Sequence, residues 1–220
     1  MRDLREGITV SYDAEAARLY KGQNEHVLPD GEGKAWLALM AALAAQRPLS
    51  GRALDIGAGT GLLTAVLKVA GLTVAGLEPS RAMIEQGLRE NPGLAAADFV
   101  QGSGGDGDLF PHACFDWIVS RQVLCHLSEV EHGFAAWHRW LKPGGHVIVS
   151  DGFWNRTSWS ETALATQPFA ALTSADPVAD SLTRIGFQIL RADEFDEVNA
   201  ARRAAFGESV TRYVIAAGKS

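Results

Sequence analysis

The residues in this sequence best suited to chemistry are three alternating glycines and the acid that precedes them. Asp55 is followed by Gly57, Gly59 and Gly61, within a short apolar run that leads into a helical pattern. Glycine has no Cβ, so such a run turns sharply from strand to helix and lets a ligand approach the backbone. The helix that follows offers free N–H groups to an anion. The pattern predicts a nucleotide-like ligand at the carboxyl edge of a parallel sheet.

The spacing of the glycines narrows the choice of cofactor. A nicotinamide-binding turn has the pattern G-x-G-x-x-G, whereas residues 57–61 have G-x-G-x-G. The segment resembles the first motif of class I S-adenosylmethionine (SAM)-dependent methyltransferases. The methionine end of SAM carries a carboxylate that suits the turn and an ammonium that Asp55 can hold, directly or through water. The turn residues expected to bind the cofactor are Gly57, Ala58, Gly59, Thr60 and Gly61.

A second acid stands at the end of the next expected strand. Glu78 follows an apolar run, precedes Pro79 and lies 21 residues after Gly57. An acid at this distance accepts hydrogen bonds from both ribose hydroxyls, as the corresponding acid does in dinucleotide-binding folds. The resemblance implies that Met83, one turn into the following helix, packs against the adenine, with ordinary core packing as the alternative. We expect Glu78, Pro79 and Met83 to contact the cofactor.

The loop after the third expected strand departs from the family pattern. The family usually has an aspartate there, which accepts a hydrogen bond from the adenine amino group. This chain has Ser103 at that position, followed by Gly104, and we expect both to contact the cofactor. Either Ser103 accepts this bond or the loop carries Asp106 into place, and a solvated turn is the alternative for Asp106.

The fourth expected strand, 115–121, leads to the residues nearest the chemistry. The resemblance places Ser120 and Arg121 beside the methionine part of SAM, and it places Gln122 in the substrate pocket. The helix that follows ends at the Pro-Gly-Gly turn over 143–145, which is typical of these enzymes, and the turn precedes another buried strand.

Strands that alternate with helical patterns predict one doubly wound α/β domain over 1–220. The resemblance implies a seven-stranded, mostly parallel sheet of order 3-2-1-4-5-7-6, with strand 7 antiparallel and N-terminal lid helices. We expect a helical lid over 1–50 and a SAM-binding core over 51–151. A substrate-side insertion and the last two strands occupy 152–220.

We expect the segments that flank this core to form the substrate pocket. Two helical patterns lie between residues 12 and 46, and in small-molecule methyltransferases such a leader folds over the cofactor, where Tyr12 or Tyr20 can touch it. A plain docking helix is the alternative. Trp154 and Trp159 follow the fifth strand. Aromatic walls suit a small-molecule pocket, and an ordinary packed loop has the same composition.

Methyl transfer mainly requires that nucleophile, methyl and sulfur lie in line, in a site that excludes water. A base helps where the nucleophile carries a proton, and His126, just past the fourth strand, is the expected base. A structural histidine is the alternative. His112, His132 and His138 show no metal-ligand spacing with acids or cysteines. We therefore expect metal-independent transfer to an O or N atom of a small molecule, with S-adenosylhomocysteine as the other product.

The charge and composition of the chain limit which partners we expect it to bind and where in the cell we expect it. The chain has 26 acids against 20 bases and a formal charge of −6, which disfavours nucleic acid. The one dense basic point, Arg202-Arg203, is expected on a solvated helix face. No run of 18 apolar residues and no signal-peptide core appear, so we expect a cytoplasmic monomer or homodimer that does not bind membranes.

The sequence alone leaves two other functions open. An NAD-dependent oxidoreductase also has an acid after its second strand, although the glycine spacing disfavours it. A SAM-binding partner subunit without activity would keep the same motifs. Turnover to S-adenosylhomocysteine distinguishes such a subunit from an enzyme.

Overall fold

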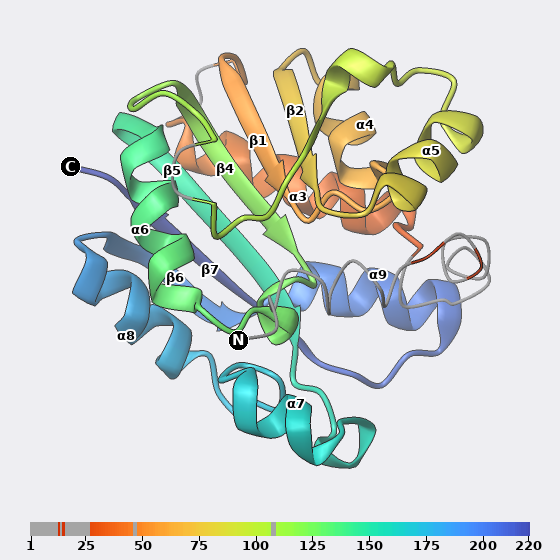
Figure 1. The fold of residues 1–220 in the computed structure, drawn as a ribbon, viewed down its shortest axis with the longest axis vertical. Coiled ribbons are helices and arrows are strands. Elements are labelled where there is room, and N and C mark those ends of the chain that lie inside the picture. The colour runs from red at the N-terminus through yellow and green to blue at the C-terminus, as the bar shows by residue number, and fades with distance from the viewer. Residues whose placement is uncertain (1–12, 14, 16–26, 46–47, 107–108) are drawn as a thin grey trace.

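Seven strands form a single sheet in the order β3-β2-β1-β4-β5-β7-β6 (Figure 1). The computed structural model describes residues 13, 15, 27–45, 48–106 and 109–220. β1 to β5 pair in parallel, and β7 runs antiparallel to both β5 and β6. This order confirms the predicted sheet. The strands are β1 Arg52–Ile56, β2 Thr73–Glu78, β3 Phe99–Gln101, β4 Phe115–Arg121, β5 Leu141–Gly152, β6 Gln188–Glu194 and β7 Arg212–Gly218.

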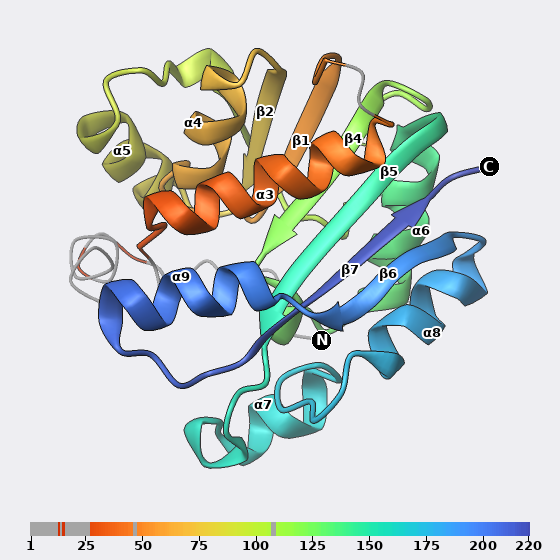
Figure 2. The ribbon, with the colours of Figure 1, turned by 180° about the vertical axis from the view of Figure 1, so that it is seen from behind.

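Helices cover both faces of the sheet. α3, α4 and α9 share one apolar cluster with one face, and α6 and α8 share another cluster with the opposite face (Figures 1 and 2). The α-helices are α3 Asp30–Leu43, α4 Leu62–Val69, α5 Arg81–Glu90, α6 Val130–Trp140, α7 Glu161–Thr166, α8 Asp176–Ile185 and α9 Asp196–Phe206. The described residues also contain three short 3₁₀ turns, η2 Ala96–Asp98, η3 Leu124–His126 and η4 Arg156–Ser158.

The central strands are apolar on both sides because both sides are buried. In β1, Leu54 and Ile56 pack into the cluster with α6 and α8, whereas Ala53 packs into the cluster with α3, α4 and α9. Alternate residues of a strand point to opposite faces, so a parallel strand between two helical layers needs apolar residues at nearly every position. Asp55 interrupts this pattern in β1, and that exception marks the site.

The site lies where the strand order reverses. β1 pairs with β2 on one side and with β4 on the other, so that Ile56 is opposite both Leu77 and Ser120. The loops after these strands leave the sheet in opposite directions, and the crevice between them is the usual ligand site of an open α/β sheet.

Two strands are longer than the ranges that their apolar patterns predict, which are 146–150 for β5 and 187–190 for β6. β5 begins at Leu141, before the Pro-Gly-Gly turn, because Leu141 pairs with Phe115 ahead of a register shift. Gly144 has a φ of +75°, a conformation that glycine adopts without strain. β6 extends to Glu194 because its outer half pairs with β7 although most of its side chains are exposed. Apolar patterning alone does not show such pairing.

The described part of the expected N-terminal lid is α3. Trp36 and Met40 of this helix are fully buried, and the Trp36 ring lies 5.9 Å from that of Phe195, next to α9. Figure 2 shows α3 and α9 side by side on the same face of the sheet. Over most of its length α3 therefore packs against the sheet and α9. Tyr12 and Tyr20 lie outside the described residues.

Within the part of the chain that the structure describes, no helix is long and apolar enough to cross a membrane.

Candidate active site

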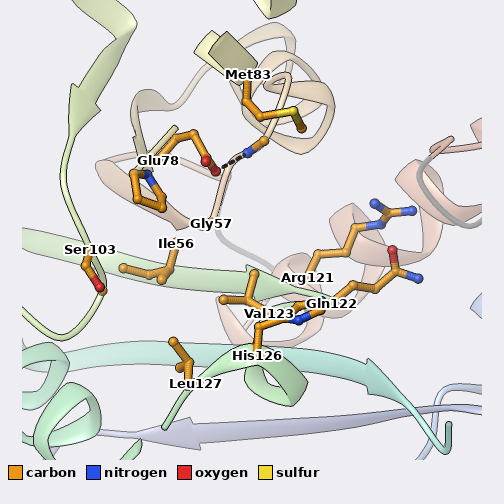
Figure 3. A pocket seen from close by; sticks show the side chains of 13 residues that line it. Ile56, Gly57, Glu78, Met83, Ser103, Arg121, Gln122, Val123, His126 and Leu127 are labelled. Carbon is orange, nitrogen blue, oxygen red and sulfur yellow. Dashed lines mark hydrogen bonds between the residues drawn. The ribbon is translucent and has the colours of Figure 1, made fainter. Parts of the chain in front are cut away.

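A cleft opens at the carboxyl edge of the sheet, beside the ends of β1, β2 and β4 (Figure 3). Most of its lining was expected from the sequence, and Ile56, Val123 and Leu127 are the exceptions. In Figure 3, Glu78 and Met83 are seen on one side of the cleft, and His126 and Leu127 on the other. The lining residues are Ile56, Gly57, Gly59, Glu78, Pro79, Met83, Ser103, Gly104, Arg121, Gln122, Val123, His126 and Leu127.

The turn between β1 and α4 depends on its glycines. Gly57, Gly59 and Gly61 have φ values of +67°, +57° and +78°, in the left-handed region that other residues rarely adopt. A Cβ on Gly57 would come within 2.3 Å of Val123 Cγ2. The turn therefore packs directly against the loop after β4, and no side chain fits between them.

Glu78 holds this turn in place. Its Oε2 accepts a hydrogen bond from Gly59 N at 2.9 Å, and its Oε1 accepts one from Ser80 N at 2.9 Å. Burial raises the pKa of Glu78, and the two backbone hydrogen bonds oppose that rise. Each carboxylate oxygen can accept more than one hydrogen bond, so Glu78 can brace the turn and still accept from ligand hydroxyls. The bracing role is not evident from the sequence.

Asp55 lies buried behind the turn. Its Oδ2 accepts a hydrogen bond of 2.7 Å from Thr64 Oγ1 in α4. Burial raises its pKa from 3.8 to about 7, against the hydrogen bond from Thr64 and the positive charge of Arg121. Asp55 and Arg121 line a small cavity together with Ala58 and Thr60. An ammonium ion in that cavity would favour the charged form of Asp55.

The start of α5 carries Met83, the residue expected against the adenine. Ser80 is its N-cap, and its Oγ accepts a hydrogen bond from Met83 N at 3.3 Å. Met83 is almost fully buried yet lines the cleft. It therefore packs in the interior and forms part of the cleft wall at once.

The loop after β3 is held by a hydrogen bond within the loop and by one from α6. Asp106 Oδ2 accepts a hydrogen bond from Ser103 N at 3.0 Å, and Gly104 O accepts one from Trp137 Nε1 at 2.7 Å. Ser103 and Gly104 line the cleft, whereas Asp106 is not among the lining residues. Asp106 thus holds the backbone of Ser103 at the cleft.

The end of β4 contributes three neighbouring residues. Ser120 is buried, and its Oγ hydrogen-bonds Ile56 O at 3.4 Å across the strand pair. Arg121 and Gln122 line the cleft. Gln122 has a φ of +58°, and its N donates to Ser150 O at 2.8 Å. A non-glycine residue in the left-handed region is strained, and such strain is concentrated at functional sites.

His126 reaches the cleft from the 3₁₀ turn η3. Asp151 fixes that turn, since its Oδ2 accepts a hydrogen bond from Cys125 N at 3.0 Å. Burial lowers the pKa of His126, and the negative charge of Asp151 opposes this effect. The neutral imidazole, which can accept a proton, is therefore favoured near neutral pH.

The two tryptophans expected in the substrate pocket are not among the lining residues of the cleft. Trp154 Nε1 donates to Asp151 Oδ1 at 2.7 Å, and the Arg212 guanidinium lies 4.6 Å from its ring centroid. The Trp159 ring lies 5.5 Å from that of His126. Its Nε1 is buried and has no hydrogen-bond partner among the described residues. Trp159 is thus adjacent to the cleft, next to the expected base.

A buried ion network beside the cleft was missed. Glu32 in α3 binds both Arg121 and Arg202, and Glu208 binds both Arg202 and Arg212. The expectation that Arg202 lies on a solvated helix face is wrong, because its side chain is only 1% exposed. The pairs join residues far apart in the chain, so no local pattern indicates them.

Among the described residues, no group of three or more histidines, cysteines, aspartates or glutamates could hold a metal ion.

The fold and the glycine turn define a doubly wound α/β protein with a nucleotide-type ligand site. Residues 54–149 match the family described as "Methyltransferase domain". An uncharacterised methyltransferase of Oceanobacillus iheyensis is 38% identical over 104 residues, which are 46% of each chain. A demethylmenaquinone methyltransferase of Renibacterium salmoninarum is 32% identical over 127 residues, 57% of this chain and 51% of the relative. Over residues 54–149 the chain is therefore similar to the class I SAM-dependent methyltransferases.

The chain spans about half the length of the curated relatives it matches. A solved structure covers more of it. Phosphoethanolamine N-methyltransferase 2 of Haemonchus contortus, in complex with S-adenosyl-L-methionine, superposes with a TM-score of 0.72 over 100% of this chain and 60% of its own. At 19% sequence identity this likeness shows the shared fold alone.

Proposed function

We propose that the protein transfers the methyl group of SAM to an O or N atom of a small molecule. The observation that carries the proposal is the cleft itself. The glycine turn braced by Glu78 forms one part of its wall, and His126 lines the same cleft. A cofactor site and a candidate proton acceptor thus share one cavity.

The residues present fit SAM in three places. Glu78 has acceptor capacity for the ribose hydroxyls. Pro79 and Met83 offer apolar surface to the adenine, and the loop at Ser103 offers polar groups to its edge. The turn, Asp55 and Arg121 suit the methionine end, where a carboxylate and an ammonium must be held.

Methyl transfer needs few catalytic side chains from the protein itself. Bound SAM supplies an electrophilic methyl, which bonds to a lone pair of the acceptor while the carbon–sulfur bond breaks and its electron pair stays on sulfur. The cleft orients the two reactants and excludes water. Where the acceptor carries a proton, neutral His126 takes it. Two of the three similar proteins named above support a small-molecule acceptor, since their names state demethylmenaquinone and phosphoethanolamine as substrates.

The proposal is tested by binding first and turnover second. Calorimetry is expected to show SAM binding in the micromolar range, about −8 kcal/mol. Gly59→Val should abolish it, since valine strains a residue at φ +57° and fills the turn. Normal binding by a folded Gly59→Val variant would refute the assignment of this turn.

Turnover is then sought by screening phenols, carboxylates and amines for release of S-adenosylhomocysteine. Methyl transfer to any of these supports an enzyme. If the protein binds SAM but turns over none of the candidate acceptors, the partner subunit without activity is favoured. If it binds no SAM, the proposed function fails outright.

A further inference from the structure

Glu32 is buried between two arginines that come from different parts of the fold. Its Oε1 lies 2.6 Å from Arg121 Nε at the end of β4, and its Oε2 lies 2.6 Å from Arg202 Nη1 in α9. The side chain of Glu32 is 3% exposed. It belongs to the first turn of α3, outside the segment that matches the methyltransferase family.

These contacts fix both the charge and the orientation of the groups involved. Burial would raise the pKa of Glu32, but the charges and hydrogen bonds of Arg121 and Arg202 outweigh burial and lower it. The carboxylate therefore stays ionised. Arg121 is held from a second side as well, since its Nη2 donates to Val27 O at 2.9 Å. A planar guanidinium with two fixed acceptors has one orientation.

Arg121 is also part of the wall of the cleft. It lines the main cleft with Gly57 and Gln122, and it lines the small cavity with Asp55. The orientation that Glu32 imposes is therefore the orientation of a cation at the expected methionine end of the cofactor site.

We propose that Glu32 is a positioning residue for the cofactor, acting through Arg121 without lining the cleft itself. The inference rests on the proposed function, because it takes SAM as the ligand of this cleft. It assigns a role in cofactor affinity to α3, a helix that otherwise packs against the sheet.

The chain offers a matched control in Glu208. This carboxylate is partly buried, with its side chain 11% exposed, and it also binds two arginines, but its partners are Arg202 and Arg212. Neither arginine lines the cleft. Removing the charge of Glu32 or of Glu208 leaves two buried arginines with a weakened partner, and both changes are expected to destabilise the fold to a similar degree. Only the change at Glu32 also frees Arg121.

The experiment measures SAM affinity by calorimetry, and the melting temperature, of Glu32→Gln, Glu208→Gln, Arg121→Gln and the double variant Glu32→Gln/Arg121→Gln. We expect Glu32→Gln to weaken SAM binding roughly tenfold or more, as for a lost charge-assisted hydrogen bond. Glu208→Gln should stay within about twofold of the parent, while both variants lose similar thermal stability. In the Arg121→Gln background, Glu32→Gln should cause no further loss of affinity.

Equal losses of affinity in Glu32→Gln and Glu208→Gln would overturn the inference, as would losses that add in the double variant. Where Glu32→Gln does not fold, Glu32→Asp replaces it, with Glu208→Asp as its control. The shorter side chain keeps the charge but cannot reach both arginines. A parent protein that binds no SAM refutes the proposed function instead, so the two failures are distinguishable.

Discussion

A single carboxylate, Glu78, both shapes the ligand site and is expected to bind the ligand. It accepts backbone hydrogen bonds from Gly59 and Ser80, so part of its capacity is used before any ligand arrives. A neutral side chain of the same shape would keep some of these bonds. The contribution to ligand binding and the contribution to the turn can therefore be separated by two substitutions.

We expect Glu78→Ala to weaken SAM binding by about 1.5 to 3 kcal/mol. The substitution removes the charge-assisted hydrogen bonds to the ribose together with the hydrogen bonds that hold the turn. Glu78→Gln should lose less, since its amide oxygen still accepts one hydrogen bond. Calorimetry on both variants checks this. Parent-like affinity in Glu78→Ala would show that Glu78 does not contact the ligand.

We expect Asp55 to make ligand binding depend on pH. Its pKa of about 7 in the folded protein lies above the usual 3.8, so between these pH values the folded protein keeps a proton that the unfolded chain releases. The contribution of Asp55 to the free energy of unfolding therefore falls as the pH rises through this window. A ligand ammonium beside Asp55 favours the carboxylate and displaces this proton.

We expect SAM affinity to rise between about pH 5.5 and 7, below the range in which an α-amino group titrates. Binding in this range should release protons, which calorimetry in buffers of different ionisation enthalpy detects. Asp55→Asn should bind SAM more weakly and lose the pH dependence. An unchanged pH dependence in Asp55→Asn would place its origin in another group.

Catalysis by a base and catalysis by positioning predict different results when His126 is substituted. If it is a base, His126→Ala should leave SAM affinity nearly intact and lower turnover by roughly 10² to 10⁴. Activity should fall as the pH drops through its lowered pKa. Asp151→Asn removes the charge that opposes this lowering, so the acid limb should move to lower pH. Retention of most of the parent's rate by His126→Ala across pH 6 to 8 would support a structural histidine.

At the scale of elements, the β1–α4 turn packs directly against the loop after β4, and both segments line the cleft. The contact is specific to one pair, because a Cβ on Gly57 meets Val123 Cγ2 at 2.3 Å. A larger residue at position 57 must therefore displace the loop that carries Gln122 and His126.

We expect Gly57→Ala to weaken SAM binding strongly in a protein that still folds. Val123→Ala removes the methyl group that clashes, so Gly57→Ala/Val123→Ala should recover part of the affinity. Recovery stays partial because alanine at φ +67° keeps a strain of about 1 kcal/mol. Calorimetry compares the two variants. Equal affinity in both would show that the backbone conformation alone matters at Gly57.

The elements predictable from the sequence are those with strong local patterns. The buried runs of β1, β2 and β4, and the N-cap of α5 at Ser80, follow from hydrophobicity and capping rules. The residues at which β5 begins and β6 ends do not follow from these rules, because pairing with a neighbouring strand determines them. Glu32 and Arg202 were missed for the same reason. Each looks like an ordinary surface charge until the partner, 170 residues away, is known.

At the scale of the whole molecule, ligand binding and stability are linked. A ligand that binds the folded protein adds about 2.7 kcal/mol to the free energy of unfolding at 100 times its Kd. For 220 residues this corresponds to a rise in Tm of about 5 to 10 °C. We expect SAM to produce this shift in the parent and a smaller one in Glu78→Ala, measured by scanning calorimetry. A parent Tm that does not respond to SAM would contradict the cofactor assignment.

The order of synthesis along the chain determines when the buried pair between Glu32 and Arg202 can form. α3 emerges early from the ribosome, but its neighbour α9 follows only after Arg121 and the whole methyltransferase segment 54–149 have been synthesised. Until then Glu32 has only one of its two arginines. A nascent chain that ends before residue 196 therefore contains every cofactor motif yet lacks the support for α3. We expect a nascent chain to retain SAM only after α9 has been synthesised.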